Sequence, residues 1–263
     1  LDGKLFIGAT DGRLIAIDSV SGKQIWASKT FEPTESKAIT GAPRAFNNMV
    51  VIGHGGAEYG TRGYVSAYDA DSGEQLWRFY TVPGNPADGF ESSAMEMAAE
   101  TWFGEWWKTG GGGTVWDGIT YDEELDQLYI GVGNGDPWDY DLRSHGKGDN
   151  LFLGSIVALD PTTGKYLWHY QSLPEERWDF KSTQDMILTD LVIDGKSRKV
   201  LMQAHMNGHF YILDRNDGQL LSAEKYAKST WAEYIDLNTG RPILSEEAKY
   251  RDGGPSRIWP SPF

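Results

Sequence analysis

Short apolar runs, each followed by glycine and aspartate, recur along the chain. Four of these runs cover residues 5–9, 49–52, 128–132 and 200–204. Apolar runs of this length, bounded by turn-forming residues, are typical of β-strands and are too short for most helices. Asp11-Gly12 and Asn207-Gly208 are dipeptides that favour tight hairpin turns. The pattern therefore predicts an all-β protein built from short antiparallel strands.

A fixed spacing of glycine and aspartate accompanies these runs. Glycine is followed six residues later by aspartate, and four residues after that by a second glycine. The four copies are Gly12/Asp18/Gly22, Gly63/Asp69/Gly73, Gly154/Asp160/Gly164 and Gly208/Asp214/Gly218. In three copies a tryptophan stands eight residues after the aspartate, as Trp26, Trp77 and Trp168. We interpret the tryptophans as packing between neighbouring units, and the aspartates as turn residues that accept hydrogen bonds from the local backbone.

The repeated unit is expected to have four strands, because residues 43–46 and 115–121 supply a further strand-like segment before two of the runs. The equivalent aspartates lie 51, 91 and 54 residues apart. Four-stranded antiparallel units at such spacing describe the blades of a β-propeller. We expect one partial propeller domain over residues 1–263. Its blades are expected at about residues 1–30, 40–81, 114–172 and 185–226, with the start of a further blade at 242–250.

The charge and composition restrict the classes of partner. The 263 residues carry 38 acidic and 24 basic side chains, a net charge of -14, which argues against charge-driven binding to nucleic acid or to anionic membranes. No apolar run is long enough for a transmembrane segment. The absence of cysteine excludes disulfides, thiolate metal ligands and a cysteine nucleophile within these residues. The first residue, Leu1, indicates a processed or incomplete polypeptide.

Unusual sequences gather in connections that share one end of the blades. In an antiparallel blade, the connection between the second and third strands and the connection to the next blade emerge at the same end. The segments with unusual sequences are residues 54–62, 82–113, 133–149 and 177–180, and all fall in these two kinds of connection. Thr40 lies in another connection to the next blade, and Thr114 and Trp116 follow residues 82–113 directly. Functional sites are commonly carried by loops on a rigid scaffold. We therefore expect the site on this face.

Four side chains in or next to these loops suggest chemistry, and three of them have a plainer alternative. Glu58 follows three small residues that allow a ligand to approach the backbone, but a solvated loop carboxylate fits equally well. Asn134 stands between two glycines and could give an amide oxygen to calcium, or serve only as a turn residue. Asp179 lies between two aromatic residues, a setting that suits a general base. Trp116 could stack on a planar ligand or pack between blades.

Taken together, the repeat and four loop motifs resemble the quinoprotein alcohol dehydrogenases of the methanol and ethanol dehydrogenase family. The motifs are Gly-Gly-Ala-Glu at 55–58, Gly-Gly-Gly-Thr-Val-Trp-Asp at 111–117, Gly-Val-Gly-Asn at 131–134 and Trp-Asp-Phe at 178–180. Members of that family are eight-bladed propellers that use pyrroloquinoline quinone (PQQ) and calcium. The resemblance implies that this chain is the middle part, about four blades, of such a propeller.

The resemblance also assigns roles to individual residues. It makes Glu58 and Asn134 calcium ligands, and it places Asp179 at the metal site as the general base that acts on the alcohol. Trp116 is expected to stack beneath the plane of the quinone. The residues expected to contact the quinone's carboxylates or rim are Thr40, Gly55, Gly56, Ala57 and Thr114. All of these positions lie in the loops of the face chosen above.

The implied activity is the oxidation of a small, primary alcohol to the aldehyde by hydride transfer to PQQ, with calcium polarising the quinone. A cytochrome c or quinone electron acceptor and a periplasmic location follow from the resemblance. Lanthanide-using relatives carry a further carboxylate where this chain has Lys181, which favours calcium. Met206 stands where the family usually has lysine or arginine beside the quinone.

Two other interpretations stay open at this point. A non-catalytic propeller, acting as a scaffold or binding module, would share the aspartate, glycine and tryptophan repeat. A family member inactivated by truncation or by Met206 would share the loop motifs as well. Because a scaffold has no need of all four loop motifs in this order, the sequence favours the enzyme.

Overall fold

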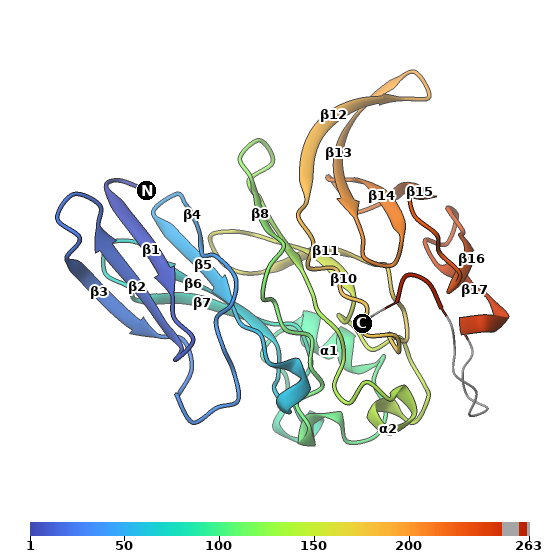
Figure 1. The fold of residues 1–263 in the computed structure, drawn as a ribbon, viewed down its shortest axis with the longest axis horizontal. Helices are drawn as coiled ribbons and strands as arrows, with labels where there is room; N and C mark the ends of the chain where they lie inside the picture. The colour runs from blue at the N-terminus through green and yellow to red at the C-terminus, as the bar shows by residue number, and fades with distance from the viewer. Residues whose placement is uncertain (249–257, 262–263) are drawn as a thin grey trace.

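The computed structural model describes residues 1–248 and 258–261, and these residues form five antiparallel sheets that follow one another in chain order (Figure 1). The first sheet has three strands, β1 (Lys4–Gly8), β2 (Arg13–Asp18) and β3 (Gln24–Lys29). The second has four, β4 (Arg44–Phe46), β5 (Met49–Gly53), β6 (Tyr64–Asp69) and β7 (Gln75–Tyr80). Each strand pairs with its neighbour in sequence.

The next two sheets repeat this meander. The third contains β8 (Ile119–Asp122), β9 (Gln127–Gly131), β10 (Ser155–Leu159) and β11 (Tyr166–Gln171). The fourth contains β12 (Ile187–Ile193), β13 (Lys196–Ala204), β14 (His209–Asp214) and β15 (Leu220–Lys225). The prediction of an all-β fold made of four-stranded antiparallel sheets is confirmed.

A fifth sheet has two strands, β16 (Ala232–Ile235) and β17 (Pro242–Leu244). It overlaps the further blade expected at 242–250 but begins ten residues earlier, and residues 249–250 lie outside the described residues. Its turn is a further copy of the repeat, since the N–H of Gly240 donates to the Asp236 carbonyl at 2.8 Å. This copy is not evident from the spacing of glycine and aspartate, because Thr230 replaces the first glycine of the repeat.

The strand expected at residues 115–121 is shorter and later than predicted. The sequence from Val115 to Gly118 runs as a loop, and β8 begins only at Ile119. Gly118 has a positive φ of 68°, which breaks the extended conformation before the strand begins. The residues before Gly118 therefore stay at the end of the sheet, where the connecting loops lie.

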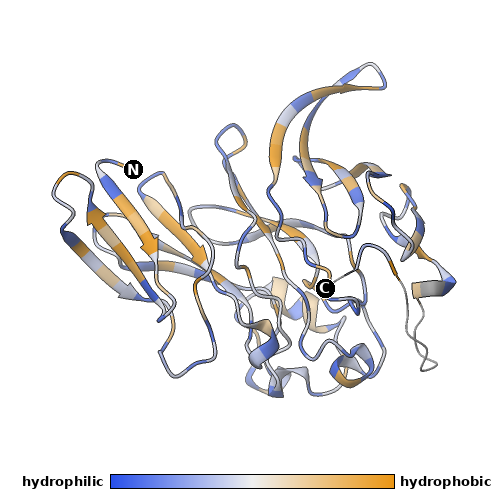
Figure 2. Cartoon of the chain, in the orientation of Figure 1, coloured by the Kyte–Doolittle hydropathy of each residue, from blue (hydrophilic) through white to orange (hydrophobic). Residues whose placement is uncertain are grey.

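Hydrophobic cores lie between neighbouring sheets, because side chains alternate along a strand. On β5, Val50 packs with β2 residues of the first sheet, whereas Val51 packs with β9 residues of the third. Every residue of β5 and β10 is buried. Figure 2 shows apolar residues concentrated in the strands and polar residues in the loops and turns. Each sheet thus depends on its neighbours for burial of its faces.

The repeated tryptophans join consecutive sheets, as expected. The indole Nε1 of Trp26 donates to the carbonyl of Ala70 at 3.1 Å, and Nε1 of Trp77 donates to the carbonyl of Pro161 at 2.9 Å. Both carbonyls belong to the turn that follows the third strand of the next sheet. Nε1 of Trp168 instead donates to the side chain of Gln127 in its own sheet.

The repeated aspartates close the turns after the third strands. Oδ1 of Asp18 accepts the N–H of Ser21 at 2.7 Å, and Oδ1 of Asp69 accepts the N–H of Ser72 at 2.7 Å. Asp160 accepts from its own turn in the same way. These aspartates therefore serve the turns, as the sequence predicts.

Long connections lie at the end of the sheets opposite these turns. They contain α1 (Ser93–Ala99) and α2 (Tyr140–Ser144), which lie toward the lower part of Figure 1, away from the hairpin tip of β12 and β13. Within the described residues, neither these nor the other helical turns combine the length and apolar character that crossing a membrane requires. The long connections define the face that carries the cleft.

Candidate functional site

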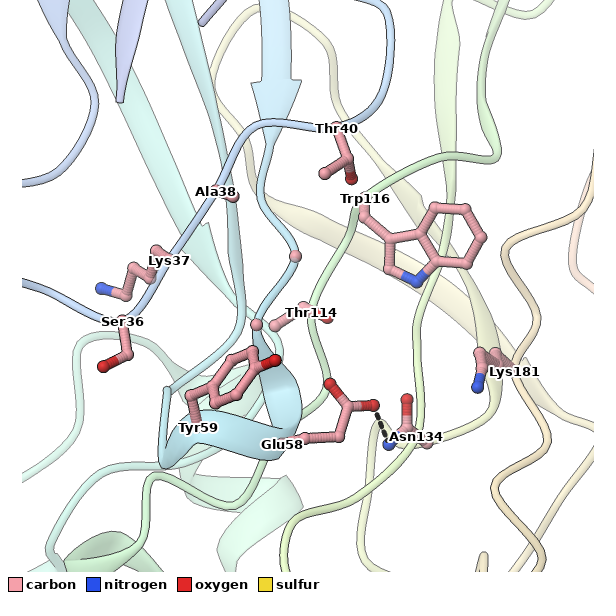
Figure 3. Close-up of a pocket in the computed structure, with 12 residues that line it drawn as sticks. Ser36, Lys37, Ala38, Thr40, Glu58, Tyr59, Thr114, Trp116, Asn134 and Lys181 are labelled. Atoms are coloured by element: carbon pink, nitrogen blue, oxygen red, sulfur yellow. Dashed lines mark hydrogen bonds between the residues drawn. The ribbon is translucent and has the colours of Figure 1, made fainter. Parts of the chain in front are cut away.

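A cleft of about 600 Å³ opens among the long connections (Figure 3). Its walls come from the segment between the first two sheets, the β5–β6 and β9–β10 connections, and the segments before β8 and β12. The lining residues are Ser36, Lys37, Ala38, Thr40, Gly55, Gly56, Glu58, Tyr59, Thr114, Trp116, Asn134 and Lys181. Seven of the nine site residues predicted from sequence therefore line one cleft.

Two predicted residues lie behind this lining. Ala57 is 1% exposed and does not line the cleft, so its side chain cannot supply the contact expected of it. Asp179 is also buried, but its carboxylate reaches Lys181, which does line the cleft. Four further residues line the cleft that were not predicted from the sequence: Ser36, Lys37, Ala38 and Tyr59.

Glycines let the β5–β6 connection press against the segment before β4. Ala38 and Gly55 form a backbone bridge, with the N–H of Gly55 donating to the Ala38 carbonyl at 2.8 Å. Gly56 has a φ of 107°, and a Cβ there would lie 2.5 Å from the carbonyl oxygen of Ser36. No other residue fits this approach. The single helical turn that follows, Ala57–Tyr59, then carries Glu58 into the cleft (Figure 3).

A run of four glycines, residues 110–113, lies between the β5–β6 and β9–β10 connections. Gly112 forms backbone bridges to Arg62 on one side and to Gly135 on the other. A Cβ on Gly112 would lie 2.6 Å from the carbonyl oxygen of Asn134. The run therefore holds Glu58 and Asn134 on adjacent walls and leads into Thr114 and Trp116.

Glu58 and Asn134 contact each other across the cleft. The Asn134 Nδ2 donates to Oε1 of Glu58 at 3.2 Å and to the carbonyl of Gly135 at 3.3 Å. With Nδ2 engaged on that side, the amide oxygen of Asn134 points into the cleft (Figure 3). The pair thus presents one carboxylate and one amide oxygen to the same space.

Asp179 adds a second carboxylate with one oxygen free. Its Oδ2 lies 2.9 Å from Nζ of Lys181, whereas its buried Oδ1 has no hydrogen-bond partner among the described residues. Burial raises the pKa of the Asp179 carboxyl; the Lys181 ammonium lowers it in part, and the Glu58 carboxylate raises it further. Asp179 also has a φ of 57°, a left-handed conformation that costs energy for a residue with a side chain.

These oxygens fit a hard divalent cation. Calcium takes carboxylate and amide oxygens together, and Glu58, Asn134 and the free oxygen of Asp179 offer both kinds. An unpartnered buried carboxylate oxygen is costly unless a cation or donor satisfies it. The residues described here contain no group of three His, Cys, Asp or Glu side chains arranged for a metal, so the donor set depends on the asparagine. The same cleft has a half-buried indole, Trp116, for a planar ligand.

Comparisons with known proteins decide the family. The model of a family described as "PQQ: Glucose/ethanol/alcohol dehydrogenase, beta-propeller domain" matches residues 29–225. The chain belongs to this PQQ dehydrogenase propeller family. The prediction that it forms part of a larger β-propeller is thereby confirmed.

Curated relatives in this family are much longer than this chain. Over 261 residues the chain is 57% identical to the "Quinohemoprotein alcohol dehydrogenase ADH IIB" of Pseudomonas putida, covering 99% of this chain and 38% of that protein. Over 265 residues it is 52% identical to the "Quinohemoprotein alcohol dehydrogenase" of Comamonas testosteroni, covering 99% and 37%. The chain therefore spans well under half of the length of these relatives.

Solved structures of the family superimpose closely on the chain. The quinohemoprotein alcohol dehydrogenase ADHIIG of Pseudomonas putida HK5 gives a TM-score of 0.95 at 54% identity, covering 98% of this chain and 38% of that structure. A structure titled "Europium-containing methanol dehydrogenase" gives a TM-score of 0.89 at 35% identity, covering 100% and 47%.

Within the PQQ family fold, Lys181 and Met206 lie together. The Met206 sulfur accepts the backbone N–H of Lys181 at 3.3 Å, and Lys181 lines the cleft. Met206, which stands where the resembling family usually has a lysine or arginine, therefore contacts Lys181, and the ammonium of Lys181 lies beside Asp179.

Proposed function

We propose that the protein containing this chain oxidises a small primary alcohol to the aldehyde, using PQQ and calcium, with Asp179 as the general base. The observation that carries this proposal is the buried Oδ1 of Asp179, which has no hydrogen-bond partner among the described residues and lies close enough to Glu58 to interact with its charge. Membership of the PQQ dehydrogenase family supports the same reaction class.

Glu58, Asn134 and Asp179 would supply oxygen ligands to the calcium ion. Two carboxylates and one amide give this ion negative charge and neutral oxygen together, as calcium sites commonly do. When bound, PQQ supplies the hydride acceptor and calcium polarises its carbonyl. The Lys181 ammonium, where lanthanide-using relatives carry a carboxylate, reduces the negative charge of the site and supports calcium rather than a trivalent ion.

Asp179 would take the hydroxyl proton of the alcohol at Oδ1, which has one lone pair for the cation and a second for the proton. Burial raises the pKa of this carboxyl, which makes the carboxylate a stronger base. Lys181 holds Oδ2, so the free oxygen keeps one orientation. The positive charge also favours the ionised form that a base requires.

The quinone would lie against the wall formed by Trp116 and the two glycines of the β5–β6 connection. Trp116 offers one face of its indole, and Gly55 and Gly56 allow the flat ligand to approach the backbone. Thr40 and Thr114 offer hydroxyl groups at the rim. Ala57 would contribute through its backbone, because its side chain is buried.

The electron acceptor would be a cytochrome c or a quinone, and the location periplasmic. The relatives carry names of both kinds, "Quinohemoprotein alcohol dehydrogenase" and "Alcohol dehydrogenase (quinone), dehydrogenase subunit". The net charge of -14 accords with a small-molecule substrate rather than nucleic acid.

Reconstitution of the full polypeptide with PQQ and Ca²⁺, followed by dye-linked oxidation of primary alcohols, tests the proposal. We expect turnover that needs both additions, and a loss of about 10²–10⁴-fold in kcat for Asp179→Asn. Asp160→Asn, in a turn at the opposite end of the sheets, is the control. Wild-type turnover in Asp179→Asn would show that another group is the base. Absence of any quinone-dependent turnover would support the non-catalytic scaffold.

A further inference from the structure

Glu176 is a carboxylate buried completely below the cleft. It lies between β11 and β12 with an exposed fraction of 0%. Its Oε2 accepts the N–H of Gly135 at 3.0 Å. Its Oε1 accepts the N–H of Trp178 at 2.9 Å and the N–H of Phe180 at 3.2 Å. Three backbone donors thus converge on one side chain.

These donors belong to the residues next to the candidate ligands. Gly135 follows Asn134 directly, and Trp178 and Phe180 flank Asp179. The two loops come from different connections, with Gly135 and Glu176 separated by 41 residues. One carboxylate therefore ties the loop that carries the amide oxygen to the loop that carries the free carboxylate oxygen.

Arg143 supports this buried charge. The guanidinium is 1% exposed, and its Nη2 donates to the backbone carbonyl of Glu176. Its Nε donates to Oδ1 of Asn150 at 3.1 Å, and its Nη1 donates to the carbonyl of Pro137 at 2.6 Å. A buried carboxylate is tolerated when hydrogen bonds and an opposite charge compensate for its lost hydration. Burial raises the pKa of the Glu176 carboxyl, whereas the Arg143 charge and the N–H donors of Gly135 and Trp178 lower it, and the hydrogen bonds fix the position of the side chain.

The hydrogen bonds of Glu176 also hold an unfavourable backbone conformation. Asp179 has a φ of 57°, a left-handed conformation that is unfavourable for a residue with a side chain. The N–H groups on both sides of Asp179 are fixed by the same oxygen of Glu176. The direction of the Asp179 carboxylate thus depends on Glu176.

We propose that Glu176 is a positioning residue that sets the separation between the Asn134 amide oxygen and the Asp179 carboxylate, and thereby the affinity of the site for its cation. It contacts neither side chain with its own carboxylate and acts through their backbone neighbours. This inference rests on the proposed metal-dependent function. Removing partners that orient metal ligands typically weakens metal binding by about 10–100-fold.

The variant Glu176→Gln in the full polypeptide tests this role. Its amide oxygen can still accept the N–H groups of Trp178 and Phe180, but its NH₂ group then faces the N–H of Gly135, donor against donor. Tb³⁺ takes the same kinds of oxygen ligand as Ca²⁺, and Lys181 is present in every variant, so the charge of this probe does not affect the comparison between variants. We expect the dissociation constant for Tb³⁺, measured by luminescence without quinone, to rise about tenfold or more. We also expect faster hydrogen exchange in residues 132–138 and unchanged exchange in residues 177–182.

Asp122→Asn is the matched control. Asp122 is a buried carboxylate that accepts the N–H groups of Glu124 at 3.0 Å and Leu125 at 3.2 Å, and it pairs with Arg215 at 3.1 Å. It ends β8, at the end of the sheet away from the cleft. We expect a lower Tm and a Tb³⁺ dissociation constant within about twofold of wild type. Equal weakening in both variants, or unchanged Tb³⁺ binding in Glu176→Gln, overturns the inference.

Two further outcomes are informative. If Glu176→Gln does not fold, Glu176→Asp replaces it, because the shorter carboxylate cannot reach both loops; wild-type exchange and Tb³⁺ affinity in that variant overturn the inference. If the wild-type protein binds no Tb³⁺ and oxidises no alcohol, the proposed function fails. Exchange in residues 132–138 still reports whether Glu176 joins the two loops.

Discussion

The ammonium of Lys181 lies 2.9 Å from Oδ2 of Asp179 and leaves Oδ1, on the same carboxylate, without a partner among the described residues. The ion pair divides the carboxylate into a fixed oxygen and a free one. A general base and a metal ligand both need this free oxygen in a constant direction. Lys181 is therefore expected to affect reaction rate more than stability.

Replacing Lys181 with methionine should lower kcat by about tenfold or more in alcohol oxidation, because a charge-assisted hydrogen bond that orients Asp179 is lost. Lys165→Met, at an exposed turn between β10 and β11, is the control and should leave kcat unchanged. Steady-state kinetics of the reconstituted enzyme checks this. Equal kcat in the two variants would contradict an orienting role.

Replacing Glu58 with glutamine should weaken calcium binding and leave the metal-free protein no less stable. Without metal, the Glu58 carboxylate repels the Asp179 carboxylate and raises the pKa of Asp179. Removing one charge relieves that repulsion, whereas the cation loses a ligand. Thermal unfolding with and without Ca²⁺ should show a smaller calcium-induced rise in Tm.

Glu91→Gln is the control for that measurement, because Glu91 pairs with Arg62 outside the cleft lining. Its calcium-induced rise in Tm should match wild type. A full calcium effect in Glu58→Gln would remove Glu58 from the metal site.

Substitution of two tryptophans should have different effects, one on the free energy of unfolding and the other on quinone binding. Trp77→Ala should cost about 3–5 kcal/mol of unfolding free energy, because its ring is buried between the second and third sheets. Trp116 is half-buried and belongs to none of the hydrophobic clusters, so Trp116→Ala should cost far less and should weaken quinone binding instead. Urea unfolding and a quinone titration of both variants measure the two effects. The reverse order of stabilities would contradict the packing described.

Acid should destabilise the protein through His205. Burial lowers the pKa of this imidazole to about 3. Its Nδ1 accepts the N–H of Asn207 at 3.1 Å. Its Nε2 lies 3.1 Å from Oγ of Ser172 and 3.0 Å from Oγ of Ser182. The unfolded chain, with a histidine pKa of about 6.5, takes up the proton first. Stability from neutral His205 is thus complete above about pH 6.5 and is lost as the pH falls toward 3.

The expected slope for this one group is about 1.4 kcal/mol per pH unit in that window. His205→Gln should be less stable at neutral pH, because it loses part of this hydrogen bonding, but its stability should fall less steeply between pH 6 and about pH 4. Urea unfolding at several pH values measures both slopes. Parallel slopes in the variant and wild type would show that His205 does not carry the acid sensitivity.

The repeat could be predicted from sequence because its signals are local. The turns at Asp18 and Asp69 depend on residues within one unit, and the tryptophans that follow stand at a fixed spacing after them. The structure has the turns, and the contacts of these tryptophans with the next sheet, as expected. The loop motifs likewise indicated the face on which the cleft opens.

The remaining walls of the cleft depend on contacts between distant segments. Ala38 lines the cleft because it pairs with Gly55, and neither residue alone carries a signal for that bridge. The burial of Ala57 behind Glu58, and the convergence of three backbone donors on Glu176, likewise arise only when separate connections pack together. The spacing of residues along the chain does not predict contacts between segments that are distant in sequence.

The apolar cores lie between the sheets, so the candidate cation ligands come together only when neighbouring sheets pack against each other. Glu58 comes from the second sheet, Asn134 from the third, and Asp179 from the connection that leads to the fourth. No single sheet holds a pair of them. The affinity for the cation should therefore depend on how closely three consecutive sheets pack. A substitution that disturbs the packing of the Trp77 ring between the second and third sheets should lower this affinity, although Trp77 lies outside the cleft.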